Sequence, residues 1–221
     1  MNKSILLEAK NISKFYKDGQ VKAVNNLSLQ VYSGEILAIR GPSGSGKSTL
    51  LHLLGGLDSP TNGTVFFNGK SIHAVCRQRG FRVKNMGFIF QAFYLWQNLN
   101  VLENVMLPLM EIPLSRKESL LRAREIINDV GLTDRVKASV KVLSMGQRQR
   151  VAVARALVAG PSVIFADEPT GSLDSRNAEN ILQLLRRVNR QHNVTVVMVT
   201  HENISTEYHD RQMQVLDGKI A

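Results

Sequence analysis

The segment with the clearest chemical role is a glycine-rich stretch at residues 41–49. It reads Gly-Pro-Ser-Gly-Ser-Gly-Lys-Ser-Thr and matches the phosphate-binding pattern G-x-x-x-x-G-K-[ST] in full. Glycines let the backbone curl until successive N–H groups point at phosphate oxygens. In this pattern Lys47 would reach the β- and γ-phosphates, and the Ser48 hydroxyl would ligate Mg²⁺. Apolar residues over 36–39 and leucines from 50 onward supply the strand and helix that must flank the loop. The segment therefore predicts a nucleoside triphosphate site rather than a chance glycine turn.

A second apolar stretch, residues 163–166, ends in two acidic residues, Asp167 and Glu168. An aspartate at the end of a strand can hold Mg²⁺ opposite a phosphate-binding loop. Because alternate residues of a strand point to opposite sides, Glu168 is expected to face another direction and to deprotonate the water that attacks the γ-phosphate. An acidic pair that merely caps a surface strand is the alternative, and the loop at 41–49 argues against it.

Residues 143–147, Leu-Ser-Met-Gly-Gln, narrow the class of protein. Ser144 with Gln147 three residues later is a capping box at a helix start, where free N–H groups can meet an anion. Together with 148–152, this segment resembles the signature motif of ATP-binding-cassette (ABC) ATPases. Met145 stands where that family usually has a glycine. The methionine side chain could slow the closure of a dimer, or it could point outward without effect.

The other motifs of the same family follow in order along the chain. Tyr16 resembles the aromatic residue that stacks on adenine, and Gln91 resembles the Q-loop glutamine. Residues 172–174, Ser-Leu-Asp, resemble the D-loop, and His201 resembles the switch histidine. The resemblance extends from about residue 5 to residue 219.

The resemblance implies an α/β fold of the P-loop NTPase (ABC ATPase) type with a core parallel sheet. It further implies an N-terminal antiparallel β-subdomain and an inserted helical subdomain at roughly 92–160, all within one domain of residues 1–221. The residue patterns agree. Strand-type residues occupy 6–12, 21–31, 35–40, 64–67, 162–166 and 194–200, and helical stripes occupy 115–130, 144–157 and 178–188. Strands that alternate with helices in the last third favour a parallel sheet.

The resemblance also implies a head-to-tail homodimer that sandwiches two ATP molecules with Mg²⁺. The expected ATP-binding residues are Tyr16, Gly41, Pro42, Ser43, Gly44, Ser45, Gly46, Lys47, Ser48 and Thr49. Residues expected to take part in hydrolysis are Glu168, His201, Gln91 and Lys47, with Ser48, Gln91 and Asp167 at the metal. Ser144, Gly146, Gln147 and Asp174 are expected to contact the partner's ATP or the dimer interface.

Composition limits where the chain works. Lys and Arg exceed Asp and Glu by 28 to 18, a net charge of +10, and no basic run reaches five residues. A solvated basic surface and a face for an acidic membrane leaflet are both open readings. The single Cys76 excludes an internal disulfide and fits a reducing compartment. No apolar run approaches the ~18 residues of a membrane span, and the first residues lack a signal-peptide core. We expect a peripheral protein on the cytoplasmic face of the inner membrane.

Three segments resemble the ABC subfamily of lipoprotein release, macrolide efflux, antimicrobial-peptide resistance and cell division: 48–58, 103–108 and 166–174. The expected partner is therefore a separate membrane permease with a large extracytoplasmic domain. The apolar run at 92–96, Ala-Phe-Tyr-Leu-Trp, either packs inside the helical subdomain or receives a short helix of that permease.

Two alternatives remain. One is a soluble ABC ATPase that acts on nucleic acid or the ribosome. The single P-loop and the absence of a heptad run between Lys47 and Ser144 argue against it. The other is a weakly hydrolysing regulatory paralogue, and Met145 is the only residue that supports it. We expect no nucleic-acid partner, and the sequence does not identify the transported substrate.

Overall fold

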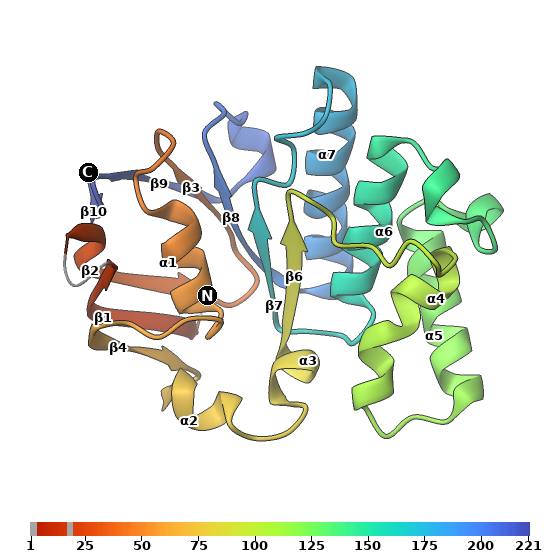
Figure 1. The fold of residues 1–221 in the computed structure, drawn as a ribbon, viewed down its shortest axis with the longest axis horizontal. Coiled ribbons are helices and arrows are strands. Elements are labelled where there is room, and N and C mark those ends of the chain that lie inside the picture. Colours follow the sequence, from red (N-terminus) through yellow and green to blue (C-terminus); the bar gives the residue numbers. More distant parts are fainter. Residues whose placement is uncertain (1–3, 17–19) are drawn as a thin grey trace.

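The computed structural model describes residues 4–16 and 20–221, and its elements fall into two sheets with helices around them (Figure 1). The smaller sheet is antiparallel and has the strand order β2-β1-β4-β5. Its strands are β1 Ile5–Tyr16, β2 Val21–Tyr32, β4 Asn62–Phe67 and β5 Lys70–Ser71. This sheet is the antiparallel N-terminal part that the sequence predicts, although β5 lies beyond the predicted strands.

The larger sheet has the order β10-β9-β3-β8-β7-β6 in the described part of the chain. Its strands are β3 Ile36–Arg40, β6 Met86–Phe90, β7 Val163–Asp167, β8 Thr195–Thr200, β9 Arg211–Leu216 and β10 Lys219–Ile220. All neighbouring pairs are parallel except β9 with β10. The loops that follow β3, β6, β7 and β8 therefore leave the same edge of the sheet, which is where ligands bind in open α/β sheets.

The central strands are buried on both faces, and their side chains alternate between two hydrophobic cores. Leu37, Phe165 and Val197 point into a core shared with α1 (Lys47–Leu54) and the antiparallel sheet. The residues one position away along each strand point into a second core with α6 (Met145–Leu157) and α7 (Ser175–His192). Burial on both faces explains why these strands read as continuous apolar runs.

The chain between β6 and β7 is helical, and all of it is described. Its elements are α4 Val101–Met106, η1 Leu107–Glu111, α5 Arg116–Asp129, η2 Thr133–Arg135, η3 Val140–Val142 and α6. The predicted capping boxes at Ser115–Glu118 and Ser144–Gln147 are confirmed. Two short helices, α2 Ile72–Cys76 and α3 Phe81–Asn85, and η4 Thr206–Tyr208 were not predicted. In Figure 1, α4, α5 and α6 gather beyond β6.

Helix α6 lies directly against β6 because Gly87 has no side chain. A Cβ atom at Gly87 would come within 2.3 Å of the Ala156 carbonyl oxygen. This contact fixes the C-terminal half of α6 to the parallel sheet, while its first turn lies in the helical part of the chain.

Candidate active site

The loop between β3 and α1 has the backbone shape that phosphate binding requires. Gly44 and Gly46 have φ angles of 79° and 96°, in the left-handed region that favours glycine. A Cβ at Gly46 would lie 1.8 Å from the Ala23 carbonyl oxygen, whereas nothing lies within 4 Å of a Cβ at Gly44. Gly46 also precedes α1 without a side-chain cap, so the first N–H groups of this helix are open to an anion.

Two buried donors in the loop are incompletely satisfied. Lys47 is only 5% exposed, and its Nζ donates to the Pro42 carbonyl oxygen at 2.7 Å. The buried Ser45 hydroxyl has no hydrogen-bond partner within the described residues. Buried polar groups without partners are costly. These donors fit a phosphate group, which would supply the missing acceptors.

The expected metal ligands Ser48 and Asp167 are brought together across the sheet. Ser48 Oγ donates to Asp167 Oδ1 at 2.9 Å, and His52 Nε2 lies 3.9 Å from Asp167 Oδ2. Within residues 4–16 and 20–221 there is no group of three His, Cys, Asp or Glu that could hold a metal. A hydroxyl beside one carboxylate still fits Mg²⁺, because this ion takes its other ligands from phosphate oxygens and water.

Glu168 faces away from Asp167 for a different reason from the one expected. It lies just after β7, not within it, and has a φ of 47°, so a left-handed residue rather than strand alternation turns its side chain. Its Oε1 lies 3.1 Å from Nδ1 of His201, which follows β8. A Cβ at Gly171 would lie 3.1 Å from both Glu168 Oε2 and Gln91 Nε2. Glu168, His201 and Gln91 therefore gather at one edge of the sheet.

Tyr16 lies beside the start of α1 at the end of β1. Its hydroxyl donates to Asp58 Oδ2 at 2.8 Å, and Lys14 Nζ lies 5.0 Å from the ring centroid. Burial raises the pKa of Tyr16, the Asp58 carboxylate raises it further, and a hydrogen bond with Thr49 opposes both. The ring is thus tied to the helix that carries the phosphate loop, and Asp58 is a supporting residue that the sequence did not single out.

The signature segment forms a second group of residues. Ser144 Oγ accepts from the backbone N–H of Gln147 at 3.3 Å, and Asp174 Oδ1 accepts from the backbone N–H of Asn177 at 2.9 Å. The backbone N–H of Asn177, followed by its side-chain amide, lowers the pKa of Asp174. A Cβ at Gly146 would lie 2.7 Å from Asn177 Oδ1, so the starts of α6 and α7 adjoin.

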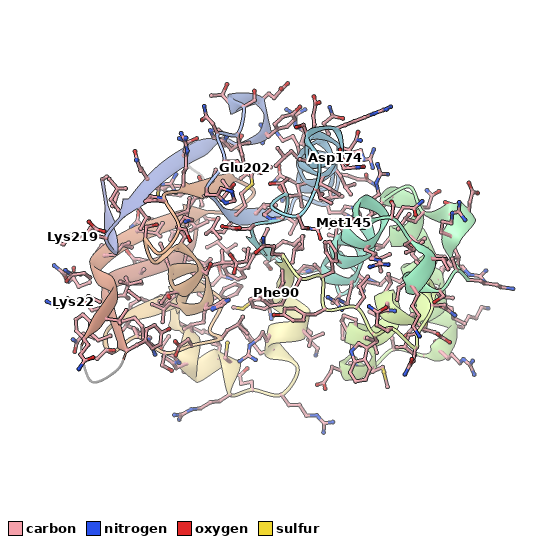
Figure 2. All side chains as sticks on the ribbon, turned by 45° about the horizontal axis from the view of Figure 1, so that its top comes forward. Lys22, Phe90, Met145, Asp174, Glu202 and Lys219 are labelled. Carbon is pink, nitrogen blue, oxygen red and sulfur yellow. The ribbon has the colours of Figure 1, made fainter. Side chains whose placement is uncertain are left out.

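A polar hollow of about 400 Å³ opens beside this group and is lined in part by Ser144, Gly146 and Asn177. Met145 is 48% exposed, and Figure 2 shows it near the start of α7, where Asp174 lies. Figure 1 shows β8, β7 and β6 between α1 and α6. Within one chain, the sequence-predicted residues therefore fall into two separate groups, the phosphate loop with the strand-end residues, and the signature with Asp174.

Some residues of the aromatic run at 92–96 pack in the core, and others are exposed, as a docking surface would require. Leu95 is buried and Phe93 packs against the core, while Tyr94 and Trp96 are 65% and 63% exposed. Phe93 and Tyr94 have φ angles of 59° and 47°. Arg155 of α6 donates to both of their carbonyl oxygens, at 2.6 and 2.5 Å, and burial lowers the pKa of its guanidinium. The sequence did not single out Arg155. Its position on the half-buried side of α6 was the only feature that could have indicated this role.

A hollow of about 310 Å³ adjoins this run and is lined in part by Phe90, Tyr94, Pro108 and Arg155. It lies between β6 and the helical part of the chain. In the residues that the structure describes, no helix is both long and apolar enough to span a bilayer.

Comparison with known proteins agrees with the fold. Residues 24–171 match the ABC transporter family. The chain is 44% identical to the lipoprotein-releasing system ATP-binding protein LolD of Colwellia psychrerythraea, over 98% of this chain and 86% of the relative. It is 43% identical to the uncharacterized ABC transporter ATP-binding protein MJ1508 of Methanocaldococcus jannaschii, over 98% of both.

Among solved structures, the fold is similar to the dimeric post-hydrolysis state of the ATP-binding cassette MJ0796 bound to ADP and Pi. The TM-score is 0.87 at 38% identity, with 97% of this chain and 96% of that chain covered. These similarities confirm the predicted α/β P-loop fold. The chain belongs to the ABC transporter family and is an ATP-binding and ATP-hydrolysing subunit of this class.

Proposed function

We propose that two copies of the chain bind two ATP molecules in a head-to-tail dimer, with each nucleotide between the phosphate loop of one copy and the signature of the other. The observation that carries this proposal is the separation of the two groups within one chain (Figure 1). Ser144 is exposed at the start of α6, and with Gly146 it lines the polar hollow beside this helix start, where free N–H groups can meet an anion. The similarity to a dimeric cassette bound to ADP and Pi supports the same arrangement.

We assign roles within each site from the contacts. Lys47, Ser45 and the N–H groups at the start of α1 bind the phosphates, Ser48 and Asp167 hold Mg²⁺ with Gln91 completing the set, and Tyr16 meets the adenine. The ion, when bound, supplies positive charge that stabilises the transferring phosphoryl group. Glu168 takes the proton of the attacking water, while His201, 3.1 Å from the Glu168 carboxylate, orients that water and the γ-phosphate.

We further propose that a membrane permease with a large extracytoplasmic domain docks on the exposed aromatic residues Tyr94 and Trp96 and the adjoining hollow. Support comes from the placement of this surface between β6, which leads to Gln91, and α6, which starts with the signature. The similarity to LolD favours lipoprotein release, or a related efflux-like process, as the work of the complex. The subunit then lies peripherally on the cytoplasmic face of the membrane, and its net charge of +10 favours an acidic leaflet.

Glu168→Gln tests the catalytic assignment. The amide keeps the size of the side chain but cannot accept the proton, so we expect ATP binding to persist, a dimer to accumulate, and turnover to fall by at least ~10²-fold. Phosphate release and size-exclusion chromatography with ATP and Mg²⁺ measure these effects. Near-normal turnover would remove Glu168 from the role of base.

The partner is tested by capturing tagged Glu168→Gln protein with ATP from a mild-detergent extract and identifying the proteins that accompany it. Co-purification of a few-helix permease with a large extracytoplasmic domain is the expected result. Ribosomal proteins or DNA without any membrane protein would favour the alternative, a soluble ABC ATPase.

A further inference from the structure

The turn that follows Glu168, residues 168–171, is held in place by two side chains that have no role in the proposed reaction. Glu168 has a φ of 47°, a conformation that L-residues other than glycine rarely adopt. Such a residue keeps this conformation only where its surroundings determine it. Its backbone N–H donates to the Val199 carbonyl oxygen, and its own carbonyl oxygen accepts from Gly171. Pro169 and Thr170 lie between Glu168 and Gly171, and their contacts hold the rest of the turn.

The first contact joins the turn to the segment after β8. Thr170 is only 1% exposed, and its Oγ1 donates to Glu202 Oε2 at 2.9 Å. Glu202 directly follows His201, is labelled in Figure 2, and is anchored in turn by its own N–H, which donates to Thr200 Oγ1 at 3.0 Å. The pairs Glu168–His201 and Thr170–Glu202 thus form two cross-links between the same two segments.

The second contact joins the turn to the signature helix. Gln149 is 1% exposed, and its Nε2 donates to the Pro169 carbonyl oxygen at 2.7 Å. Its Oε1 is buried without a hydrogen-bond partner among the described residues. Only half of this buried amide is therefore satisfied. It connects α6, whose first turn carries Ser144, to the residue next to Glu168.

We propose that Glu202 and Gln149 are positioning residues that clamp the 168–171 turn and so hold the Glu168 carboxylate against His201. This inference rests on the proposed role of Glu168 as the base. A base that is misplaced by about 1 Å loses about 10²-fold in rate, while the phosphate loop that binds ATP is untouched. The clamp should therefore act on kcat and not on KM.

Steady-state ATP hydrolysis by the full chain tests the clamp. In Glu202→Ala, Thr170 loses its acceptor, and we expect kcat to fall by about 10- to 100-fold with KM for ATP unchanged within about two-fold. Glu202→Gln keeps an acceptor oxygen and should restore kcat to within about three-fold of the parent. Thr170→Val, which has nearly the same shape, should match Glu202→Ala, and Thr170→Ser should match the parent.

Gln149→Met, which has similar volume and no amide, tests the second contact and should also lower kcat selectively. Thermal unfolding of every variant accompanies the kinetics. Because Glu202 is only half-buried, Glu202→Ala keeps the test decisive even where a variant at the fully buried Thr170 or Gln149 does not fold.

Four outcomes would overturn the clamp. Equal kcat in Glu202→Ala and Glu202→Gln would show that the hydrogen bond to Thr170 does not position Glu168. A change confined to KM would place the effect in ATP binding. Near-normal turnover of Glu168→Gln in the same assay would refute the proposed base and the clamp together, whereas a loss in Glu168→Gln with parental kcat in Glu202→Ala would refute the clamp alone.

Discussion

Arg155 is expected to hold the Phe93–Tyr94 turn in its observed shape, which belongs to the surface that we propose as the permease docking site. Its guanidinium donates to the carbonyl oxygens of both residues, at 2.6 and 2.5 Å, and both residues are left-handed. The change Arg155→Lys keeps the charge and most of the stem, but a single ammonium cannot reproduce the two-pronged contact. The variant therefore isolates one hydrogen bond.

The magnitude follows from the contact that is lost. A hydrogen bond to a charged group contributes about 1.5–3 kcal/mol, and the left-handed conformations of Phe93 and Tyr94 disfavour the closed turn once the contact weakens. Since 1.4 kcal/mol is a factor of ten, the open population of the turn should rise by about ten-fold or more. Global stability should change less, because the strained residues relax locally.

Limited digestion with chymotrypsin measures this population, because cleavage after Phe93 or Tyr94 requires local opening and tracks the open fraction. Mass spectrometry identifies the fragments. The matched control is Arg148→Lys, since Arg148 lies on the same helix and also donates to two successive carbonyl oxygens, those of Val140 and Lys141. Equal cleavage at 93–94 in the two variants, within about two-fold, would refute the reasoning that Arg155 holds this turn.

Two further predictions concern the signature and a helix cap. Met145→Gly should leave ATP turnover equal or higher if the half-exposed methionine hinders dimer closure, and a sharp loss would show that Met145 contributes to the interface instead. Hydrogen bonds from Ser115 lower the pKa of Glu118 from its ordinary 4.5. The cap should therefore stabilise α5 fully above about pH 4.5 and lose its effect as the pH falls through the lower folded value. Urea unfolding compared with Glu118→Gln, which has no such pH dependence at this position, checks the direction.

The local elements of the site could be predicted because their signals lie within short segments. The 41–49 pattern needs only glycines, a lysine and a serine at fixed spacing, and the structure has the expected strand before it and helix after it. The capping boxes at Ser115 and Ser144 depend on a residue three positions later, so the sequence predicts them too. Their apolar runs predicted the buried parallel strands β3, β7 and β8, whereas the parallel strands β6 and β9 were not predicted.

Contacts between distant segments could not be read in this way. Gln149 and Glu202 looked like ordinary polar residues, and only the packing of α6 and β8 around the 168–171 turn brings them to Pro169 and Thr170. The direction of Glu168 was reasoned from strand alternation, whereas the chain leaves β7 one residue earlier and turns left-handed.

The sequence alone predicts a nucleotide-binding protein, because phosphate binding depends on residue types at close spacing. The tertiary structure decided which groups share a site. It brought Ser48 of α1 to Asp167 at the end of β7, and it joined Glu168 to His201, which follow the neighbouring parallel strands β7 and β8. It also set the signature apart from the phosphate loop, because the sheet and the helical segment place α1 and α6 on different sides of β7 and β6 (Figure 1). Such separations arise from packing over the whole chain, which no short motif encodes.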